Sequence, residues 1–175
     1  MEFLVFSDSH GNYIHMKRIL DTYASEVDGV IFLGDGAAEI CTLRRMFAPL
    51  PFYAVLGNND DMDYLNYGFY REYFLSAHGK SVLLCHGHAH GISGGKERLA
   101  SYARVRGAHA VLYGHLHTPW ESYVEGNDHP DAPNKGPILL CSPGSIAYPR
   151  NAEAPSFGRL HIAENGILFS IGYIK

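Results

Sequence analysis

The chain has 175 residues, of which 46% are hydrophobic and 18% are charged, and its formal net charge at pH 7 is −4. This length suits one continuous core, so we expect a single domain over residues 1–175. Proteins that bind nucleic acid tightly concentrate Lys and Arg, so the composition predicts no strong nucleic-acid binding. No apolar run reaches the roughly 20 residues that span a membrane, and the first residues do not resemble a signal peptide. We therefore expect a cytoplasmic protein without membrane contact, and three cysteines without paired spacing fit a reducing compartment.

The first third of the chain alternates apolar runs with segments of helical periodicity. Continuous apolar runs predict buried strands at residues 4–6, 30–33 and 52–56. Apolar residues at helical spacing predict helices near residues 16–24 and 40–47. This strand–helix–strand–helix–strand order predicts a parallel sheet with right-handed crossovers.

The rest of the chain is expected to be richer in short strands. Residues 69–75 and 81–85 flank a turn-like segment, which predicts a hairpin. A helix is expected over about residues 95–106. Further elements are short strands at residues 110–113, 120–124, 138–141, 158–162 and 167–173, and an exposed loop at residues 125–137. Pairing is expected to be mostly antiparallel here, and two sheets packed face to face with helices outside would accommodate both halves.

Histidine is unusually frequent, with 11 residues, six of which fall between His86 and His117. Five predicted strands are each followed directly by polar residues and a glycine. These segments are residues 7–12, 34–36, 57–60, 86–88 and 114–117. Reactive side chains gather at the carboxyl edge of an open parallel sheet, so we expect the five segments to build one site.

Each of these segments also has an ordinary interpretation when it is taken alone. Asp8 and Asp35 precede predicted helices and could be N-caps. Asn58 and Asn59 could be plain turn residues, and the histidines could be solvated or structural. Unrelated local roles for all five segments at one sheet edge would require five coincidences, so we favour one shared site.

The residue types favour a site for divalent metal ions. Carboxylates and imidazoles without thiolates suit Zn, Mn, Fe, Ni or Mg. The seven candidate ligands are Asp8, His10, Asp35, Asn58, His86, His115 and His117. This number exceeds what one four-coordinate ion needs and suits two ions, which a carboxylate can bridge with its two oxygens. Two dications would attract a phosphoester and would lower the pKa of a bound water.

The ordered signature resembles that of the calcineurin-like metallophosphoesterases. It consists of Asp8-x-His10, Gly34-Asp35, Gly57-Asn58-Asn59-Asp60, His86 and Gly114-His115-x-His117. The short length and the segment Ser142-Pro143-Gly144-Ser145 resemble the small bacterial and archaeal phosphodiesterase subgroup. The resemblance implies an α/β fold, a four-layer α/β/β/α sandwich with two mixed sheets flanked by helices. It also implies two divalent metal ions, Mn²⁺ above all, with Ni²⁺, Fe²⁺, Zn²⁺ and Mg²⁺ as alternatives.

The resemblance also implies a role for each signature residue. One metal ion would be held by Asp8, His10 and His117. The other would be held by Asn58, His86 and His115. Asp35 would bridge the two ions, and Asp60 would orient the polar groups of its loop.

Two departures from the family pattern affect the expected chemistry. Large phosphatases of the family carry His at the position of Asn59, where it helps to protonate the leaving group. An amide cannot serve as a general acid, although Asn59 could bond a phosphoryl oxygen. Either His88 supplies the proton, or the substrates have leaving groups that need little help. The subgroup's Asn-Pro-Gly-Ser is here Ser142 to Ser145, either a plain turn or a turn that borders the site near Ser142 or Arg150.

The most economical function is dinuclear metal-dependent hydrolysis of a small phosphoester by metal-bound hydroxide. Phosphodiesters are favoured because a diester carries one negative charge less, and no Lys or Arg lies in the signature loops. Phosphomonoesters stay open as substrates. A scaffold protein on the same fold, like the family's retromer subunit, and a mononuclear amide hydrolase are the alternatives. The aromatic residues 64–74 could pack in the core, stack on a nucleobase or join subunits in a homo-oligomer.

Overall fold

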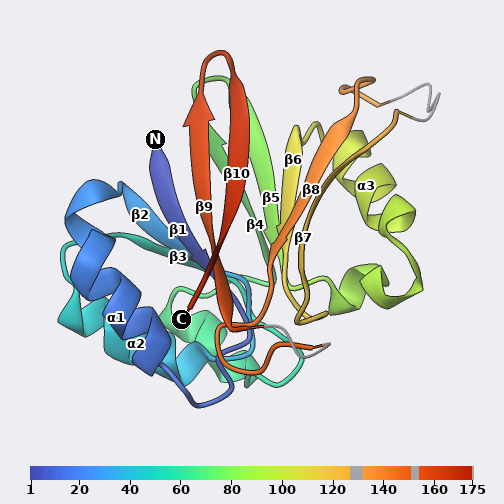
Figure 1. Ribbon diagram of the computed structural model, residues 1–175. Helices are drawn as coiled ribbons and strands as arrows, with labels where there is room; N and C mark the ends of the chain where they lie inside the picture. The colour runs from blue at the N-terminus through green and yellow to red at the C-terminus, as the bar shows by residue number, and fades with distance from the viewer. Residues whose placement is uncertain (127–131, 151–153, 175) are drawn as a thin grey trace.

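The computed structural model describes residues 1–126, 132–150 and 154–174 (Figure 1). Within these residues the strands form two five-stranded sheets. The first has the order β10-β9-β1-β2-β3, with β1 (Glu2–Phe6), β2 (Gly29–Phe32), β3 (Phe52–Ala54), β9 (Ser156–Ala163) and β10 (Gly166–Tyr173). The second has the order β4-β5-β6-β8-β7, with β4 (Glu72–Ala77), β5 (Lys80–Cys85), β6 (Ala110–Tyr113), β7 (Pro119–Val124) and β8 (Ile138–Pro143).

Both sheets mix parallel and antiparallel pairs. In the first sheet β1, β2 and β3 are parallel, as the sequence predicts, and the hairpin of β9 and β10 joins β1 antiparallel. In the second sheet β5, β6 and β8 are parallel at the centre, and β4 and β7 pair antiparallel at the edges. The parallel centre differs from the mostly antiparallel pairing expected there. Its strands β6 and β8 are buried along their whole length, which is typical of parallel strands covered on both faces.

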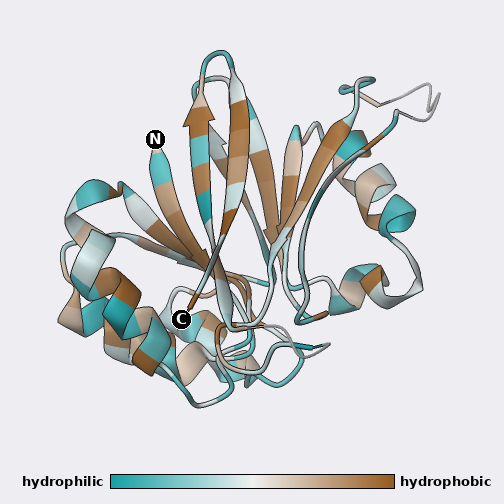
Figure 2. Ribbon diagram, viewed as in Figure 1, coloured by the Kyte–Doolittle hydropathy of each residue, from teal (hydrophilic) through white to brown (hydrophobic). Residues whose placement is uncertain are grey.

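Three apolar layers hold four structural layers together. Residues such as Val5 and Ile31 from the first sheet pack with Leu84 and Leu112 from the second in a central cluster. The helices α1 (Ile14–Tyr23) and α2 (Ala37–Met46) cover the outer face of the first sheet, and α3 (Lys96–Val105) covers the second (Figures 1 and 2). The α/β/β/α sandwich with two mixed sheets is therefore confirmed.

The segment between the two sheets shows the clearest local differences from expectation. Residues 69–75 were expected to form one strand, but β4 begins only at Glu72. The reason is that Phe69 is buried in the helix-side cluster, while Tyr70 forms a single bridge to Val55. The short helix η2 (Met62–Tyr67) precedes this bridge. The predicted hairpin of β4 and β5 is confirmed.

Three smaller expectations also have an outcome. Cys41, Cys85 and Cys141 are all free thiols. No helix in the described ranges is long and apolar enough to cross a membrane. Within the expected loop 125–137, residues 127–131 lie outside the described residues, and the others belong to no helix or strand.

Candidate metal centre

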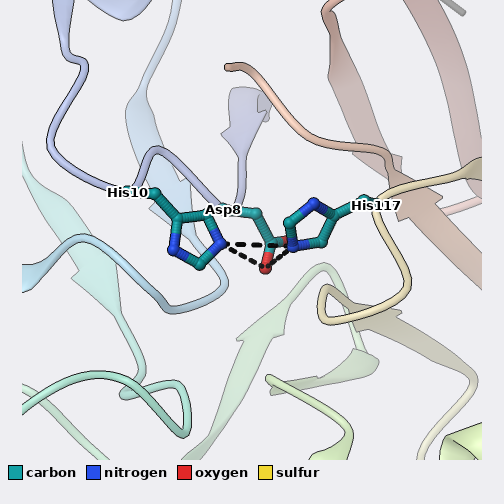
Figure 3. Close-up of side chains that lie close together, drawn as sticks. All are labelled: Asp8, His10 and His117. Atoms are coloured by element: carbon teal, nitrogen blue, oxygen red, sulfur yellow. Dashed lines mark hydrogen bonds and ion pairs between the residues drawn. The ribbon is translucent and has the colours of Figure 1, made fainter. Parts of the chain in front are cut away.

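The polar segments of the signature follow strands of both sheets and meet where the two sheets come together. Strand β1 leads to Asp8 and His10, and β6 leads to His117. The ligand atoms of these three side chains lie within 4.8 Å of one another (Figure 3). His10 Nε2 is 3.2 Å from His117 Nε2, and His117 Nε2 is 3.3 Å from Asp8 Oδ1. Sequence positions more than 100 residues apart therefore form one compact group.

A second compact group shares Asp8 with the first. It consists of Asp8, Asp35 and His86, all three buried, again with ligand atoms within 4.8 Å of one another. Asp35 Oδ2 lies 3.5 Å from His86 Nε2 and 3.7 Å from His10 Nε2. This oxygen stands between the two groups, which is the position that a bridging carboxylate needs. The shared place of Asp8 is a feature that the sequence did not predict.

Two further predicted ligands lie beside the second group. Asn58 Oδ1 is 3.1 Å from His86 Nε2, so the amide oxygen reaches this group. The His115 ring centre is 5.2 Å from that of His86, and the His115 backbone N–H donates to Asp8 Oδ2. The ring nitrogens of His115 belong to neither compact group. The structure thus brings six of the seven predicted ligands close together. The ring of His115 lies beside the second group without belonging to it.

Backbone carbonyls orient two of the histidines. His86 Nδ1 donates to Leu33 O at 2.7 Å, and His117 Nδ1 donates to Tyr148 O at 2.7 Å. Each bond requires the proton on Nδ1, which leaves Nε2 free to face the carboxylates. This arrangement of a ring held from behind is common among metal-binding histidines in proteins.

The donor set fits divalent cations. Asp8 Oδ1 is buried and accepts no hydrogen bond from any described residue. Burial alone would raise the pKa of Asp35, but His86 and the donors of Asn59 outweigh it and hold this pKa far below the ordinary value. Burial opposes the charge on His86, yet the Asp35 carboxylate raises its pKa, and the interaction with Asp8 raises the pKa of His117. Ionised carboxylates and imidazole nitrogens that face one another are suitable ligands for a divalent metal ion.

Asp60 holds backbone rather than facing the cluster. Its Oδ2 accepts hydrogen bonds from the N–H groups of Asp35 and Gly57, and its Oδ1 accepts from those of Gly36 and Ala37. Four donors occupy both oxygens, at 2.8 to 2.9 Å. This geometry suits the orienting role that the resemblance implies and places Asp60 behind the reacting atoms.

Asn59 and His88 both lie beside the cluster. Asn59 donates to Asp35 from its backbone N–H at 2.8 Å and from Nδ2 at 2.6 Å. His88 is exposed, and its ring centre lies 5.2 Å from that of His86 and 6.2 Å from that of His115. Partial burial and the neighbouring histidines lower the pKa of His88.

The backbone is strained at five of the signature residues. In the described part of the chain, six residues other than glycine have positive φ, and five of them are Asp8, His10, Asp35, His115 and His117. Such a conformation is unfavourable for residues with a Cβ and persists only where the surroundings enforce it. The sixth, His78, is in the hairpin turn before β5. Strain is thus concentrated where the candidate ligands are.

Two glycines of the signature allow the loops to approach one another. A Cβ on Gly57 would stand 2.0 Å from Asp35 Oδ1, and one on Gly114 would stand 2.0 Å from Ser7 Oγ. No side chain fits at either position without moving the neighbouring loop. These glycines therefore serve the contact between site segments as well as the turns.

The turn at residues 142–145 borders the site and contacts the Asp8 loop. The sequence left open whether this segment borders the site or is a plain turn. Ser145 Oγ donates to Asp8 O at 2.8 Å and accepts from Tyr148 N at 2.7 Å. Ser145 therefore connects the Asp8 loop to the residue whose carbonyl orients His117.

Ser142 is buried, and its hydroxyl accepts a hydrogen bond from Gly144 N within the turn. Arg150 donates its backbone N–H to His117 O, so it does lie beside the site. Ser145 and Tyr148 were not predicted as functional residues, and the family-like turn was the only signal.

A cavity of about 450 Å³ adjoins the cluster. The cluster contributes His10, Asp35 and Asn59 to its wall, and η2 contributes Tyr64. The remaining charged lining residues are Glu39, Asp60 and Asp61. The wall contains no lysine and no arginine from the described residues. The aromatic segment is thereby divided, because Tyr64 lines this cavity while Phe69 is buried in the core.

Comparisons with known proteins identify the family of this chain. The family model for the calcineurin-like phosphoesterase superfamily domain matches residues 1–165. Over 160 residues, covering 91% of this chain and 83% of the relative, the chain is 31% identical to a Bacillus subtilis (strain 168) protein named probable metallophosphoesterase YsnB. Both similarities extend over nearly the whole chain, and the residues matched by the family model include every signature segment.

Solved structures show the same architecture. A conserved uncharacterised protein of Streptococcus pneumoniae, described as a predicted phosphoesterase, aligns with a TM-score of 0.73 and 26% identity over 98% of this chain and 88% of that chain. Vps29 of Entamoeba histolytica in complex with Zn²⁺ aligns with a TM-score of 0.69 and 22% identity over 99% of both chains. The second likeness concerns the fold alone.

Proposed function

This chain belongs to the calcineurin-like phosphoesterase superfamily, and from that premise we propose that it is a single-domain, dinuclear metal-dependent phosphodiesterase. Family membership indicates a metallophosphoesterase, a hydrolase that acts on a phosphoester. The preference for diesters and the assignment of individual residues are our proposals. The observation that carries the metal assignment is the pair of compact Asp and His groups that share Asp8.

We assign the seven predicted ligands to two divalent ions, with Mn²⁺ as the first candidate. Asp8, His10 and His117 would hold one ion. His86 and Asn58 would hold the other together with His115, and Asp35 would serve both ions. When bound, two such ions polarise a phosphoryl group and make water a stronger nucleophile near neutral pH.

The chain's own side chains bind and orient the phosphoester. Asn59 Nδ2 now bonds Asp35, and it is free to donate to a phosphoryl oxygen once a cation takes up that carboxylate. Asp60 keeps the Asp35 loop in place through its four backbone bonds. His88 is exposed and its ring lies beside that of His86, and we assign it the contact with the leaving oxygen.

The charge of the adjoining cavity favours a diester. Its wall contains Glu39, Asp60 and Asp61 but no basic residue among those described. A phosphomonoester is a dianion near neutral pH and would meet more repulsion there than a singly charged diester does. The diester preference thus has support in the structure beyond the composition of the loops.

The test compares two aryl substrates on protein loaded with Mn²⁺. We expect bis(p-nitrophenyl) phosphate to be hydrolysed with a higher kcat/KM than p-nitrophenyl phosphate, and elemental analysis to find two metal ions per chain. The Asp21→Asn variant, which changes an exposed carboxylate on α1, is the matched control and should retain full activity. Preference for the monoester would overturn the diester assignment. Two bound ions without turnover of any phosphoester would instead favour a scaffold protein.

A further inference from the structure

A second cavity, of about 500 Å³, lies outside the metal cluster. Three elements build it: the start of β4, the short helix η3 (His88–His90) and α3. The lining residues are Arg71, Glu72, Ala89, His90, Arg98 and Tyr102. None of them belongs to the signature or has a role in the proposed reaction.

This cavity and the metal centre share one edge of the second sheet. Glu72 pairs with Cys85 in the antiparallel ladder of β4 and β5. Arg71 directly precedes Glu72 and His86 directly follows Cys85, so this last pair of the ladder connects the cavity with the metal cluster. Helix η3 begins with His88 beside the metal cluster and ends with His90 in the cavity wall. One turn of chain therefore separates the two sites.

The floor of the cavity is a closed polar arrangement. Glu72 accepts hydrogen bonds from Tyr102 Oη at 2.8 and 3.0 Å, and His90 Nε2 lies 3.1 Å from its Oε2. The His90 and Tyr102 rings pack edge to face at 4.7 Å. The hydrogen bonds of the Glu72 carboxylate are thus made with Tyr102 and His90, and the carboxylate forms no ion pair with Arg71 or Arg98.

The unengaged groups on this cavity are positively charged or polar. Arg71 and Arg98 are exposed, and neither forms an ion pair with a described residue. His90 Nδ1 is buried and has no hydrogen-bond partner in the described ranges. Two guanidinium groups over a polar floor match the oxygens of a phosphate, to which arginine donates paired hydrogen bonds.

We propose that this cavity binds a second phosphate group of the substrate, on the part that does not react, through Arg71 and Arg98. The proposal rests on the proposed phosphodiesterase activity and narrows its substrate class to phosphodiesters that carry a further phosphate. It also explains an asymmetry of the site. The wall of the cavity beside Asp35 contains acidic residues and no arginine, whereas this one contains two arginines and a single carboxylate, Glu72, that is already hydrogen-bonded.

The kinetic test uses two substrates that differ by one phosphate. They are thymidine 5′-(p-nitrophenyl phosphate) and the same compound phosphorylated at the 3′ oxygen. We expect the 3′-phosphorylated form to have a KM lower by roughly 10- to 100-fold, the range of a charge-assisted contact. The double variant Arg71→Ala, Arg98→Ala should lose this difference and keep its kcat/KM for the plain substrate. Arg18→Ala, on the exposed face of α1, is the matched control.

A binding measurement separates failure of this proposal from failure of the proposed function. Calorimetric titration of the Mn²⁺-loaded protein with thymidine 3′,5′-bisphosphate and thymidine 5′-monophosphate needs no turnover. Tighter binding of the bisphosphate by the natural chain, lost in the double variant, supports the cavity even if neither ester is hydrolysed. Equal affinity for both nucleotides, or an unchanged difference in the double variant, overturns the cavity whatever the activity is.

Discussion

The two sheets contribute different chemistry to the site. The first sheet presents carboxylates and amides at the ends of β1, β2 and β3, together with one imidazole. These residues are Asp8, His10, Asp35, Asn58, Asn59 and Asp60. The second sheet presents only imidazoles at the ends of β5 and β6, namely His86, His88, His115 and His117. The difference continues in the two cavities, of which the first is acidic and the second carries arginines.

This division means that neither sheet has a complete site. Each compact group takes ligands from both sheets, because His117 joins Asp8 and His10, and His86 joins Asp8 and Asp35. Their relative position depends on the central apolar cluster between the sheets. The candidate metal centre is therefore a property of how the sheets pack, and the following predictions test that dependence.

The largest expected effect comes from removing one ligand of either sheet. Asp35→Asn and His86→Asn should each lower kcat/KM for the aryl diester by roughly 100-fold or more, because even loss of an orienting partner costs 10- to 100-fold. Elemental analysis should find fewer than two ions per chain in both variants. Circular dichroism should show a retained fold. Full activity of either variant would break the view that both sheets supply essential ligands.

The next effect depends on the leaving group. His88→Asn should lower kcat by roughly 100-fold for a diester with a poor alkyl leaving group, the usual minimum for general acid catalysis. The same variant should hydrolyse the p-nitrophenyl diester almost normally, because that leaving group needs no proton. An equal loss on both substrates would show that His88 has another role. The comparison would also decide whether the second sheet contributes a proton donor or only ligands.

A glycine substitution tests the contact between loops of the first sheet. Gly57→Ala places a Cβ 2.0 Å from Asp35 Oδ1, so we expect a loss of about 1–3 kcal/mol in the free energy of unfolding and weaker metal binding. Urea unfolding and a metal titration measure the two effects. Gly166→Ala is the matched control, because an added Cβ there meets nothing within 4 Å. Similar results for both glycines would contradict the close-approach argument.

The smallest effect isolates backbone strain in the second sheet. His115 has φ of 70° and forms no side-chain hydrogen bond with the described residues, so two truncations differ mainly in backbone freedom. His115→Gly should be more stable than His115→Ala by about 1 kcal/mol, since glycine adopts this conformation without penalty. Urea unfolding of both variants without metal gives the difference. The usual order, with alanine the more stable, would show that His115 is unstrained.

Local patterns in the sequence predicted much of the fold. The strand and helix alternation of the first third was predictable because apolar periodicity there follows a regular parallel sheet. The segment around Phe69 and Tyr70 was not, since its aromatic residues divide between core, bridge and cavity wall. The parallel pairing of β6 with β8 was also missed, because β7 intervenes in the chain but lies at the sheet edge.

The sequence by itself determined which residue types follow the strands and therefore the kind of chemistry the site performs. Only the tertiary structure decided how these residues meet: that Asp8 belongs to both groups, that Asp60 holds backbone, and that Ser145 supports Asp8. It also decided where Arg71 and Arg98 gather. The physical reason is that a strand end is a local property, whereas the distance between two strand ends depends on the packing of the whole core.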